Sequence, residues 1–179
     1  MADVFSVLRK DHAVVKQLLT RLEAGEVTGP TIDELVMAES RHEAAEEMYF
    51  WPAVRDKAEG GRELADHAVA QERKAKIILE DLRRAAPGTE QFAKLAAAFA
   101  GAAREHIAFE EERTWPALGH VLTAKDGLEL GGRIELAKKI GPTRPHPHGP
   151  DGPVGLKTVG TAAAMMDKMA DVLMRRGRS

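Results

Sequence analysis

The sequence predicts an all-α protein: an antiparallel up-down four-helix bundle with additional helices towards the C-terminus. Three observations predict it. The composition is rich in alanine and only 4% aromatic, which favours helix over strand. Apolar residues recur with helical spacing in four long segments. The joints between these segments are short, so consecutive helices have to run antiparallel.

The four bundle helices are expected at residues 3–24, 31–58, 61–86 and 89–119. Their joints read AGEVTGP, AEGGR and AAPGT, and each contains glycine or proline, which end helices. The chain has 179 residues, enough for one domain with a substantial core. We therefore expect one compact bundle with short loops.

The character of the sequence changes after the fourth segment. We assign residues 1–119 to the bundle, 120–140 to an additional helix, 141–155 to a Pro/Gly-rich strap or linker, and 156–179 to a C-terminal amphipathic helix. The last helix is expected to dock on the bundle or on a partner protein. His146 and His148 lie in the strap and are interpreted as linker residues.

An internal repeat divides the first 119 residues into two halves. DHAV at 11–14 recurs at 66–69, and RHEAAEEMYFWPAV at 41–54 matches EHIAFEEERTWPAL at 105–118. Each half thus contributes one Asp-His helix and one helix with a His-x-x-x-Glu motif. A site with pseudo-twofold symmetry at the centre of the bundle is the expected consequence.

Every predicted bundle helix has a histidine on its apolar stripe, and two helices add a glutamate one turn later, on the same face. A single histidine of this kind is more often a hydrogen-bonded core residue, and an isolated His-x-x-x-Glu is usually a surface ion pair. Two uncompensated glutamates facing a core would each cost several kcal/mol, however, so the combination favours a metal site. The candidate ligands are His12, His42, Glu46, His67, His106 and Glu110.

Imidazole and carboxylate donors without any cysteine suit iron or manganese better than a structural zinc ion. Two glutamates among several histidines suit two ions better than one. The order of the motifs resembles the hemerythrin-like (HHE) domain proteins, in particular the mycobacterial and other actinobacterial members, over residues 5–118. This resemblance implies a non-haem di-iron cofactor of two iron ions with an oxo, hydroxo or water bridge. It makes the histidines terminal ligands and Glu46 and Glu110 bridging carboxylates.

The sequence departs from the oxygen-carrying pattern at one ligand. That pattern has a further histidine one turn after the histidine of the third helix, where this chain has Gln71, followed by Glu72. Tyr49 is a candidate replacement because it follows Glu46 on the inward face, and a core aromatic residue is the alternative. Glu72 is a weaker candidate for the missing ligand, because its rotation from His67 puts it off the inward stripe, and a solvated surface charge is the favoured interpretation. Asp11 and Asp66 either orient an imidazole on a neighbouring helix or are solvated.

Loss of a neutral imidazole favours redox chemistry over reversible O2 transport. The sequence therefore predicts a di-iron protein that reacts with hydrogen peroxide or O2, with catalase-like peroxide decomposition as the most concrete form. The alternative is a module that binds or senses O2, nitric oxide or iron without turnover and signals through its C-terminal helix. A metal-free helical interaction protein with a polar core is a third interpretation.

Composition argues against several other classes of protein. The formal net charge of −2 gives no reason to expect nucleic-acid binding. The longest apolar run is too short to span a bilayer, and the N-terminal residues lack the apolar segment of a signal peptide. We expect a cytoplasmic protein without membrane partners.

Overall fold

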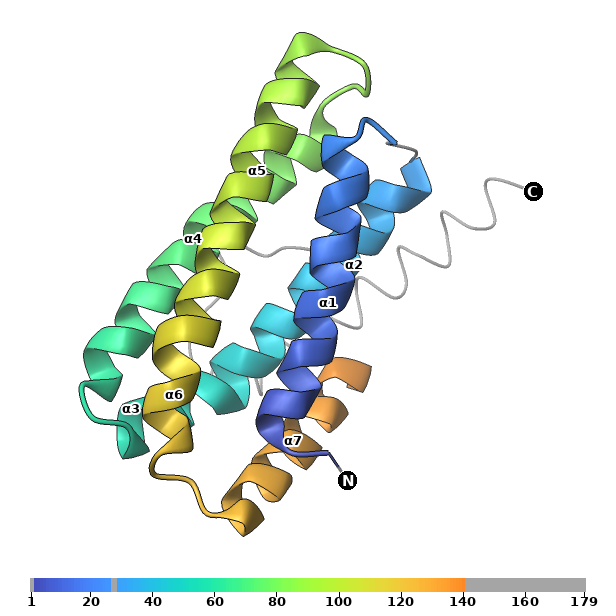
Figure 1. The fold of residues 1–179 in the computed structure, drawn as a ribbon. Coiled ribbons are helices and arrows are strands. Elements are labelled where there is room, and N and C mark those ends of the chain that lie inside the picture. Colours follow the sequence, from blue (N-terminus) through green and yellow to red (C-terminus); the bar gives the residue numbers. More distant parts are fainter. Residues whose placement is uncertain (1, 27–28, 141–179) are drawn as a thin grey trace.

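The computed structural model describes residues 2–26 and 29–140, and every regular element in this part of the chain is helical. Four long helices form the bundle: α1 (Val4–Glu23), α2 (Gly29–Ala45), α4 (Gly61–Arg84) and α5 (Glu90–Phe109). They alternate in direction (Figure 1). The predicted all-α bundle is thus confirmed, and the expected strap at 141–155 and helix at 156–179 lie outside the described residues.

Two of the bundle helices continue through a π-helical turn into a short α-helix. α2 is followed by η1 (Glu46–Phe50) and α3 (Trp51–Lys57), and α5 is followed by η2 (Glu110–Thr114) and α6 (Trp115–Gly119). After a short connection the chain forms α7 (Ala124–Ile140), which packs against α1, α2 and η1. α7 lies within residues 120–140, where the sequence predicts an additional helix.

Local sequence explains where the helices begin. The Asp3 carboxylate accepts hydrogen bonds from the amides of Phe5 and Ser6 at the start of α1. Thr89 accepts from the amide of Phe92 at the start of α5. Gly60, with a φ of +62°, turns the chain into α4 in a conformation that favours glycine.

The core consists of two apolar clusters with a polar layer between them. One contains Leu19, Leu35, Leu79 and Phe99 among others, and the second contains Leu8, Phe50, Trp51, Leu118 and Ile134 among others. Each bundle helix passes from one cluster to the other, and at the crossing it buries polar side chains instead of apolar ones. These crossing residues are His12 on α1, His42 and Glu46 at the end of α2, Glu72 on α4, and His106 and Glu110 at the end of α5.

The N-terminus of the chain passes very close to α7 at Gly131. A Cβ atom on this residue would lie 2.4 Å from the carbonyl oxygen of Ala2 and 2.9 Å from the amide nitrogen of Val4. Both contacts are with backbone, which cannot move without displacing the start of α1 or α7.

We therefore expect Gly131→Ala to lower the free energy of unfolding by about 1–3 kcal/mol through steric overlap. Gly101→Ala is the matched control, because it also lies within a helix but a Cβ atom there would meet nothing within 4 Å. The control should stabilise the protein by ~0.5–1 kcal/mol through helix propensity. Urea unfolding of the two variants checks this, and equal effects of the two substitutions would contradict the close approach.

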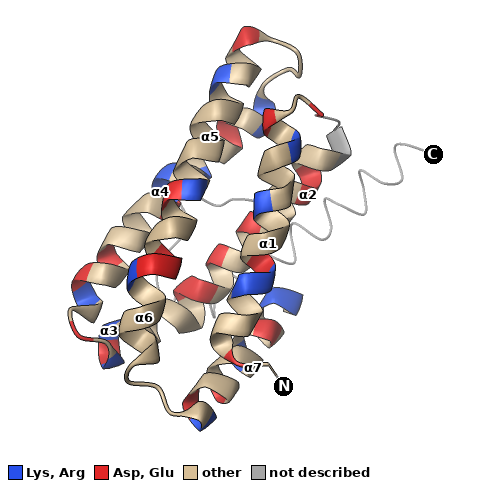
Figure 2. Ribbon diagram, in the orientation of Figure 1, with Lys and Arg blue, Asp and Glu red and all other residues tan. Residues whose placement is uncertain are grey.

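Charged positions of both signs occur on every long helix (Figure 2). In the described part of the chain, none of the helices combines the length and the apolar character needed to cross a membrane.

Candidate metal centre

The two π-helical turns place Glu46 and Glu110 in equivalent positions, because each glutamate is the first residue of its turn. The amide of Trp51 bonds to the carbonyl of Glu46, five residues back, and Trp115 bonds to Glu110 in the same way. A proline follows each tryptophan. Proline has no amide hydrogen, and its ring clashes with the carbonyl four residues back in a regular α-helix, so the wider turn accommodates it.

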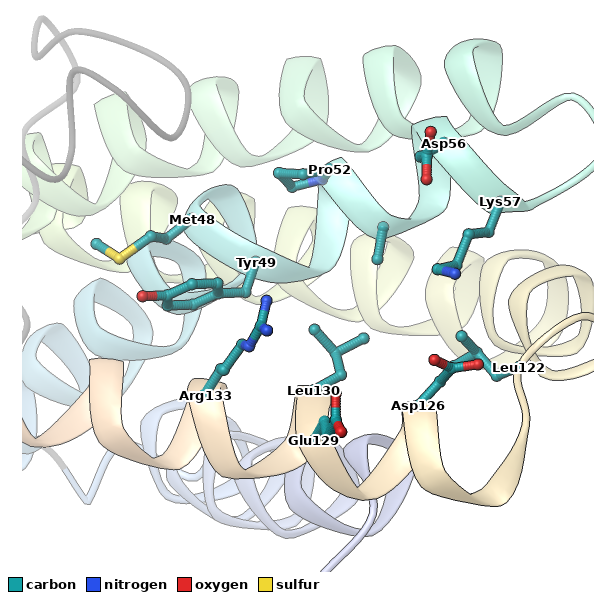
Figure 3. A pocket seen from close by; sticks show the side chains of 11 residues that line it. Met48, Tyr49, Pro52, Asp56, Lys57, Leu122, Asp126, Glu129, Leu130 and Arg133 are labelled. Atoms are coloured by element: carbon teal, nitrogen blue, oxygen red, sulfur yellow. The ribbon is translucent and has the colours of Figure 1, made fainter.

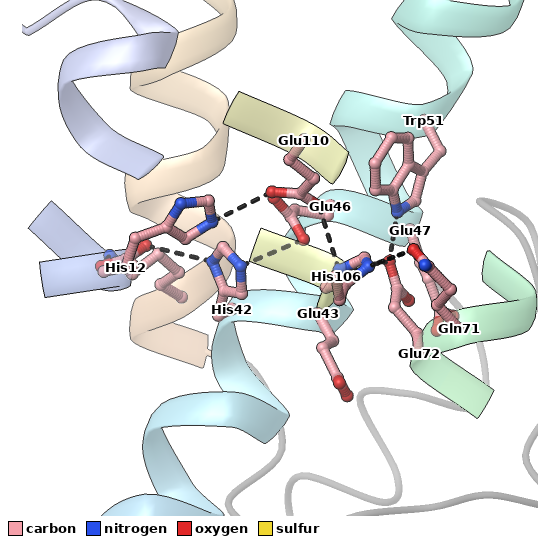
Figure 4. Close-up of polar contacts among 12 residues, drawn as sticks. His12, His42, Glu43, Glu46, Glu47, Trp51, Gln71, Glu72, His106 and Glu110 are labelled. Carbon is pink, nitrogen blue, oxygen red and sulfur yellow. Dashed lines mark hydrogen bonds and ion pairs between the residues drawn. The ribbon is translucent and has the colours of Figure 1, made fainter. Parts of the chain in front are cut away.

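The six crossing residues converge at mid-height of the bundle. One group of potential metal donors contains His12, His42, Glu46 and Glu110, with donor atoms all within 4.8 Å of one another. A second group, with the same spacing, contains Glu46, Glu110, His106 and Glu72. The groups share the two glutamates of the π-turns, and Figure 4 shows the remaining donors on opposite sides of this pair.

Glu110 connects the two groups through its two oxygen atoms. Its Oε2 lies 3.0 Å from Nε2 of His12, and its Oε1 lies 3.0 Å from Nε2 of His106. Glu46 places Oε2 3.2 Å from Nε2 of His42. A carboxylate that directs one oxygen to each of two imidazoles has the geometry of a bridging ligand between two metal ions.

The outward nitrogen of each imidazole is held by a polar side chain. Nδ1 of His12 donates to Oε1 of Glu111 at 2.9 Å, and Nδ1 of His106 donates to the amide oxygen of Gln71 at 3.3 Å. Nδ1 of His42 lies 3.5 Å from Oδ2 of Asp11. A proton on Nδ1 leaves the lone pair of Nε2 directed into the cluster, as in metal-bound histidines.

The inward donor atoms are fully buried, and they form no hydrogen bond with a group outside the cluster. They comprise Nε2 of His12, His42 and His106, both carboxylate oxygens of Glu46 and Glu110, and one oxygen of Glu72. Buried polar atoms are normally hydrogen-bonded, so six such side chains facing one another fit a cation that is bound between them.

Burial and mutual repulsion of the carboxylates perturb their pKa values. Burial, together with the charges of Glu110 and Glu72, raises the pKa of Glu46 well above its usual range. Burial also raises the pKa of Glu72, although Lys76 opposes the shift. Burial alone would lower the pKa of His106, but the Glu110 carboxylate next to it raises this pKa to about 9. Without a metal ion, this cluster therefore retains protons at neutral pH.

Five of the residues predicted from sequence lie in the cluster, namely His12, His42, Glu46, His106 and Glu110. The inward position predicted for His67 is wrong. Its side chain is exposed on α4, and its ring lies 4.6 Å from that of Phe109. The reason is the register of α4, whose buried face contains Ala65, Ala68, Glu72, Ala75, Leu79 and Leu82 rather than the neighbouring stripe through residues 64, 67 and 71.

Glu72 is the residue that the sequence interpretation ranked too low, because a solvated charge was favoured over a ligand there. It has no exposed area, and its Oε1 accepts a hydrogen bond from the indole nitrogen of Trp51 at 2.5 Å. The signal was present in the regular spacing of the apolar residues 65, 68, 75, 79 and 82 around it. The DHAV repeat instead favoured the stripe that contains His67.

Tyr49, the predicted replacement ligand, is half-buried and lines a surface pocket of about 580 Å³ between η1, α3 and α7. Figure 3 shows its ring in the wall of this pocket, with Met48 and Arg133. The additional donor that the structure brings to the cluster is Glu72.

The two aspartates of the repeat have different surroundings. Asp11 is largely buried between His42 and Lys138, as expected for a residue that orients an imidazole. Asp66 is exposed and pairs with Arg55, which agrees with the solvated alternative for this residue. Lys138 is on α7, and this ion pair therefore connects the added helix to Asp11, which lies beside His42 of the cluster.

Lys138→Met is expected to weaken metal binding by about tenfold, because removal of the ammonium leaves the Asp11 carboxylate without the cation that holds it beside His42. Lys139→Met is the control, since this residue is exposed on the same helix. Competition with a chelator of known affinity measures the difference. Identical affinities of the two variants would exclude a role of α7 in orienting His42.

Comparison with known proteins agrees with this architecture. Residues 3–118 match the family model of the hemerythrin HHE cation-binding domain. An uncharacterised hemerythrin-like protein of Schizosaccharomyces pombe is 25% identical over 142 residues, which cover 79% of this chain and 70% of that protein. The crystal structure of a hemerythrin HHE cation-binding domain-containing protein from Mycobacterium kansasii aligns with a TM-score of 0.67 and 22% identity, covering 93% of this chain and 99% of that one. Because the family model covers most of the chain and its region contains the buried His/Glu cluster, this protein belongs to the hemerythrin HHE cation-binding domain family.

Proposed function

We propose that the chain is a non-haem di-iron protein that reacts with hydrogen peroxide or O2, most concretely by catalase-like decomposition of peroxide. The observation that supports the proposal best is the position of Glu110 between His12 and His106, with one carboxylate oxygen near each imidazole. This arrangement suits two ions that are close enough to act on one small substrate.

The donor set supports iron or manganese as the bound metal. Three imidazole nitrogens and three carboxylates line the cluster, and the chain contains no cysteine to select zinc or a cluster of iron and sulfur. Glu72 brings a third carboxylate to the cluster, in addition to those of Glu46 and Glu110. Anionic donors stabilise the more highly charged, oxidised state of a metal ion, which favours redox turnover over reversible carriage of O2.

In the proposed reaction, one hydrogen peroxide molecule loses two electrons and two protons and becomes O2. A second molecule gains these electrons and protons and becomes two molecules of water. Bound iron supplies the capacity to accept and return the two electrons. Glu46 and Glu110 hold the spacing of the centre, and the anchored imidazoles keep their orientation. The apolar clusters on both sides limit the access of bulk water.

The second candidate is a module that binds or senses O2, nitric oxide or iron without turnover. The contact from His42 through Asp11 to Lys138 favours it, because it joins the cluster to α7 outside the four-helix bundle. A change in metal state that moved His42 would alter this contact, and a partner protein on α7 could respond to it.

The test is metal analysis of protein expressed with ample iron, followed by measurement of O2 release from hydrogen peroxide with an oxygen electrode. We expect bound iron and one O2 for every two peroxide molecules consumed. His106→Ala should lose both, whereas His67→Ala should retain both, because only the first histidine lies in the cluster. Bound iron without O2 release would favour the binding module, and protein without iron would refute both candidates.

A further inference from the structure

The two halves of the candidate centre are not chemically equal. Both groups use Glu46 and Glu110, but one adds two imidazoles, His12 and His42, whereas the other adds one imidazole and the carboxylate of Glu72. We refer to these as the His12–His42 position and the Glu72 position. The internal repeat of the sequence would make them equal, so their difference arises from residues outside the repeat pattern.

On their inward side, the donors specific to the His12–His42 position face only the two shared glutamates, Glu110 and Glu46. The polar partners Glu111 and Asp11 contact only the outward Nδ1 atoms, so that each Nε2 is left for a ligand. These partners are carboxylates, and a negative charge behind an imidazole increases its strength as a donor. Nothing in these contacts has to be broken when a cation binds.

Glu72, in contrast, already has partners of opposite polarity. Its Oε1 accepts from the Trp51 indole, and its Oε2 lies 3.7 Å from the ammonium nitrogen of Lys76, one turn later on α4. Lys76 also contacts Glu47 and lies 3.7 Å from Glu43, and its side chain is only 15% exposed. The carboxylate of Glu72 is thus paired with a fixed cation of the protein. Figure 4 shows that it also contacts Trp51 and faces the cluster.

A fixed ammonium close to a metal position opposes binding in two ways. It repels the incoming cation, and the repulsion is strong because screening by water is weak at a buried site. It also attracts the Glu72 carboxylate that the metal ion would need as a donor. Glu43 and Glu47 keep Lys76 in place, since moving it would leave their buried carboxylates without a counter-charge.

We propose that the two metal positions fill in order, the His12–His42 position first and the Glu72 position second, and that Lys76 sets the affinity of the second. Lys76 is a positioning residue that acts through Glu72. The inference rests on the proposed dinuclear centre and adds to it an order of loading and a residue that controls it. The Glu72 position is then the one that exchanges its ion with solution.

The test is a titration of the metal-free protein with Mn²⁺ under exclusion of air, followed by electron paramagnetic resonance. The first equivalent is expected to give the spectrum of an isolated ion, and the second to convert it into that of a coupled pair. Glu72→Gln should retain the first step and lose the second. Lys76→Met should strengthen the second step by about tenfold or more, because the repulsion is removed. Lys74→Met, which removes an exposed lysine from the same helix, should leave both steps unchanged.

If Lys76→Met does not fold, the double variant Lys76→Met with Glu47→Gln removes one charge of each sign and should show the same gain. Equal affinities of the two positions in the unaltered protein, or a second step that Lys76→Met weakens or leaves unchanged, would overturn the inference. Because manganese binding is measured without peroxide, these outcomes differ from failure of the proposed function. A protein that loads two ions in order but releases no O2 would refute only the peroxide reaction.

Discussion

Glu46→Gln is expected to abolish dinuclear metal binding and, at the same time, to make the metal-free protein more stable. Glu46 belongs to both donor groups, so its loss affects both positions, and metal affinity should fall by at least ~100-fold. The same carboxylate is fully buried next to Glu110 and Glu72, which raise its pKa together with burial. Replacing it with a neutral side chain of similar size should therefore stabilise the metal-free protein by about 1–3 kcal/mol.

Metal analysis after iron loading and urea unfolding of the chelator-treated protein measure the two effects. Glu105→Gln is a suitable control, because it also removes one glutamate charge but from an exposed position on α5. It should change neither quantity. A Glu46→Gln variant that binds two ions, or one that is less stable than the unaltered protein without metal, would contradict the assignment of Glu46 to the centre.

The stability of the metal-free protein is expected to fall as the pH rises from 6.5 to 9. The pKa of His106 is about 9 in the folded protein and 6.5 for an unperturbed histidine, so the folded state holds a proton that the unfolded state releases in this range. The stabilisation is complete below pH 6.5 and is lost as the pH approaches 9. Glu39 adds to the fall, because burial and the neighbouring Glu43 raise its pKa to about 8. The loss should amount to roughly 2 kcal/mol or more.

Urea unfolding at several pH values checks this expectation. Bound metal replaces the protons of the cluster, so the metal-loaded protein should lose less stability than the metal-free protein over the same range, and metal affinity should increase with pH. His106→Gln should flatten the profile of the metal-free protein, and His67→Ala should keep it, since His67 is exposed outside the cluster. A flat profile for the unaltered metal-free protein would show that the cluster does not retain these protons.

Much of the fold follows from local patterns in the sequence. The predicted helices at 3–24, 61–86 and 89–119 differ by at most two residues at either end from the helical segments of the structure. Short joints with glycine and proline could be recognised because their effect on the backbone is local. Glu46 and Glu110 could be found for a similar reason. Each belongs to a repeated motif, His-x-x-x-Glu followed by Trp-Pro, in which the histidine and the glutamate are one helical turn apart.

α4 shows where this reasoning fails. This amphipathic helix has two neighbouring stripes of similar apolar content. One stripe includes His67 and the other includes Glu72, so the apolar pattern alone does not decide which of them faces the core. Sequence similarity between DHAV at 11–14 and at 66–69 favoured His67, but the helix is rotated so that Glu72 faces the cluster. Gln71, which we noted only as a missing histidine, contacts His106 from the edge of the buried face.

The sequence by itself determined the helical bundle, the repeat and five of the six clustered side chains, because each depends on residues close together in the chain. Only the tertiary structure decided which face of α4 points inward, and with it that Glu72 is buried in the cluster while His67 is exposed. It also showed that Lys138 reaches Asp11 and that Lys76 lies among three glutamates. The physical reason is that successive side chains of a helix point about 100° apart, so a rotation of α4 about its axis brings a different stripe of residues inward. Only packing against the other helices selects one of these rotations.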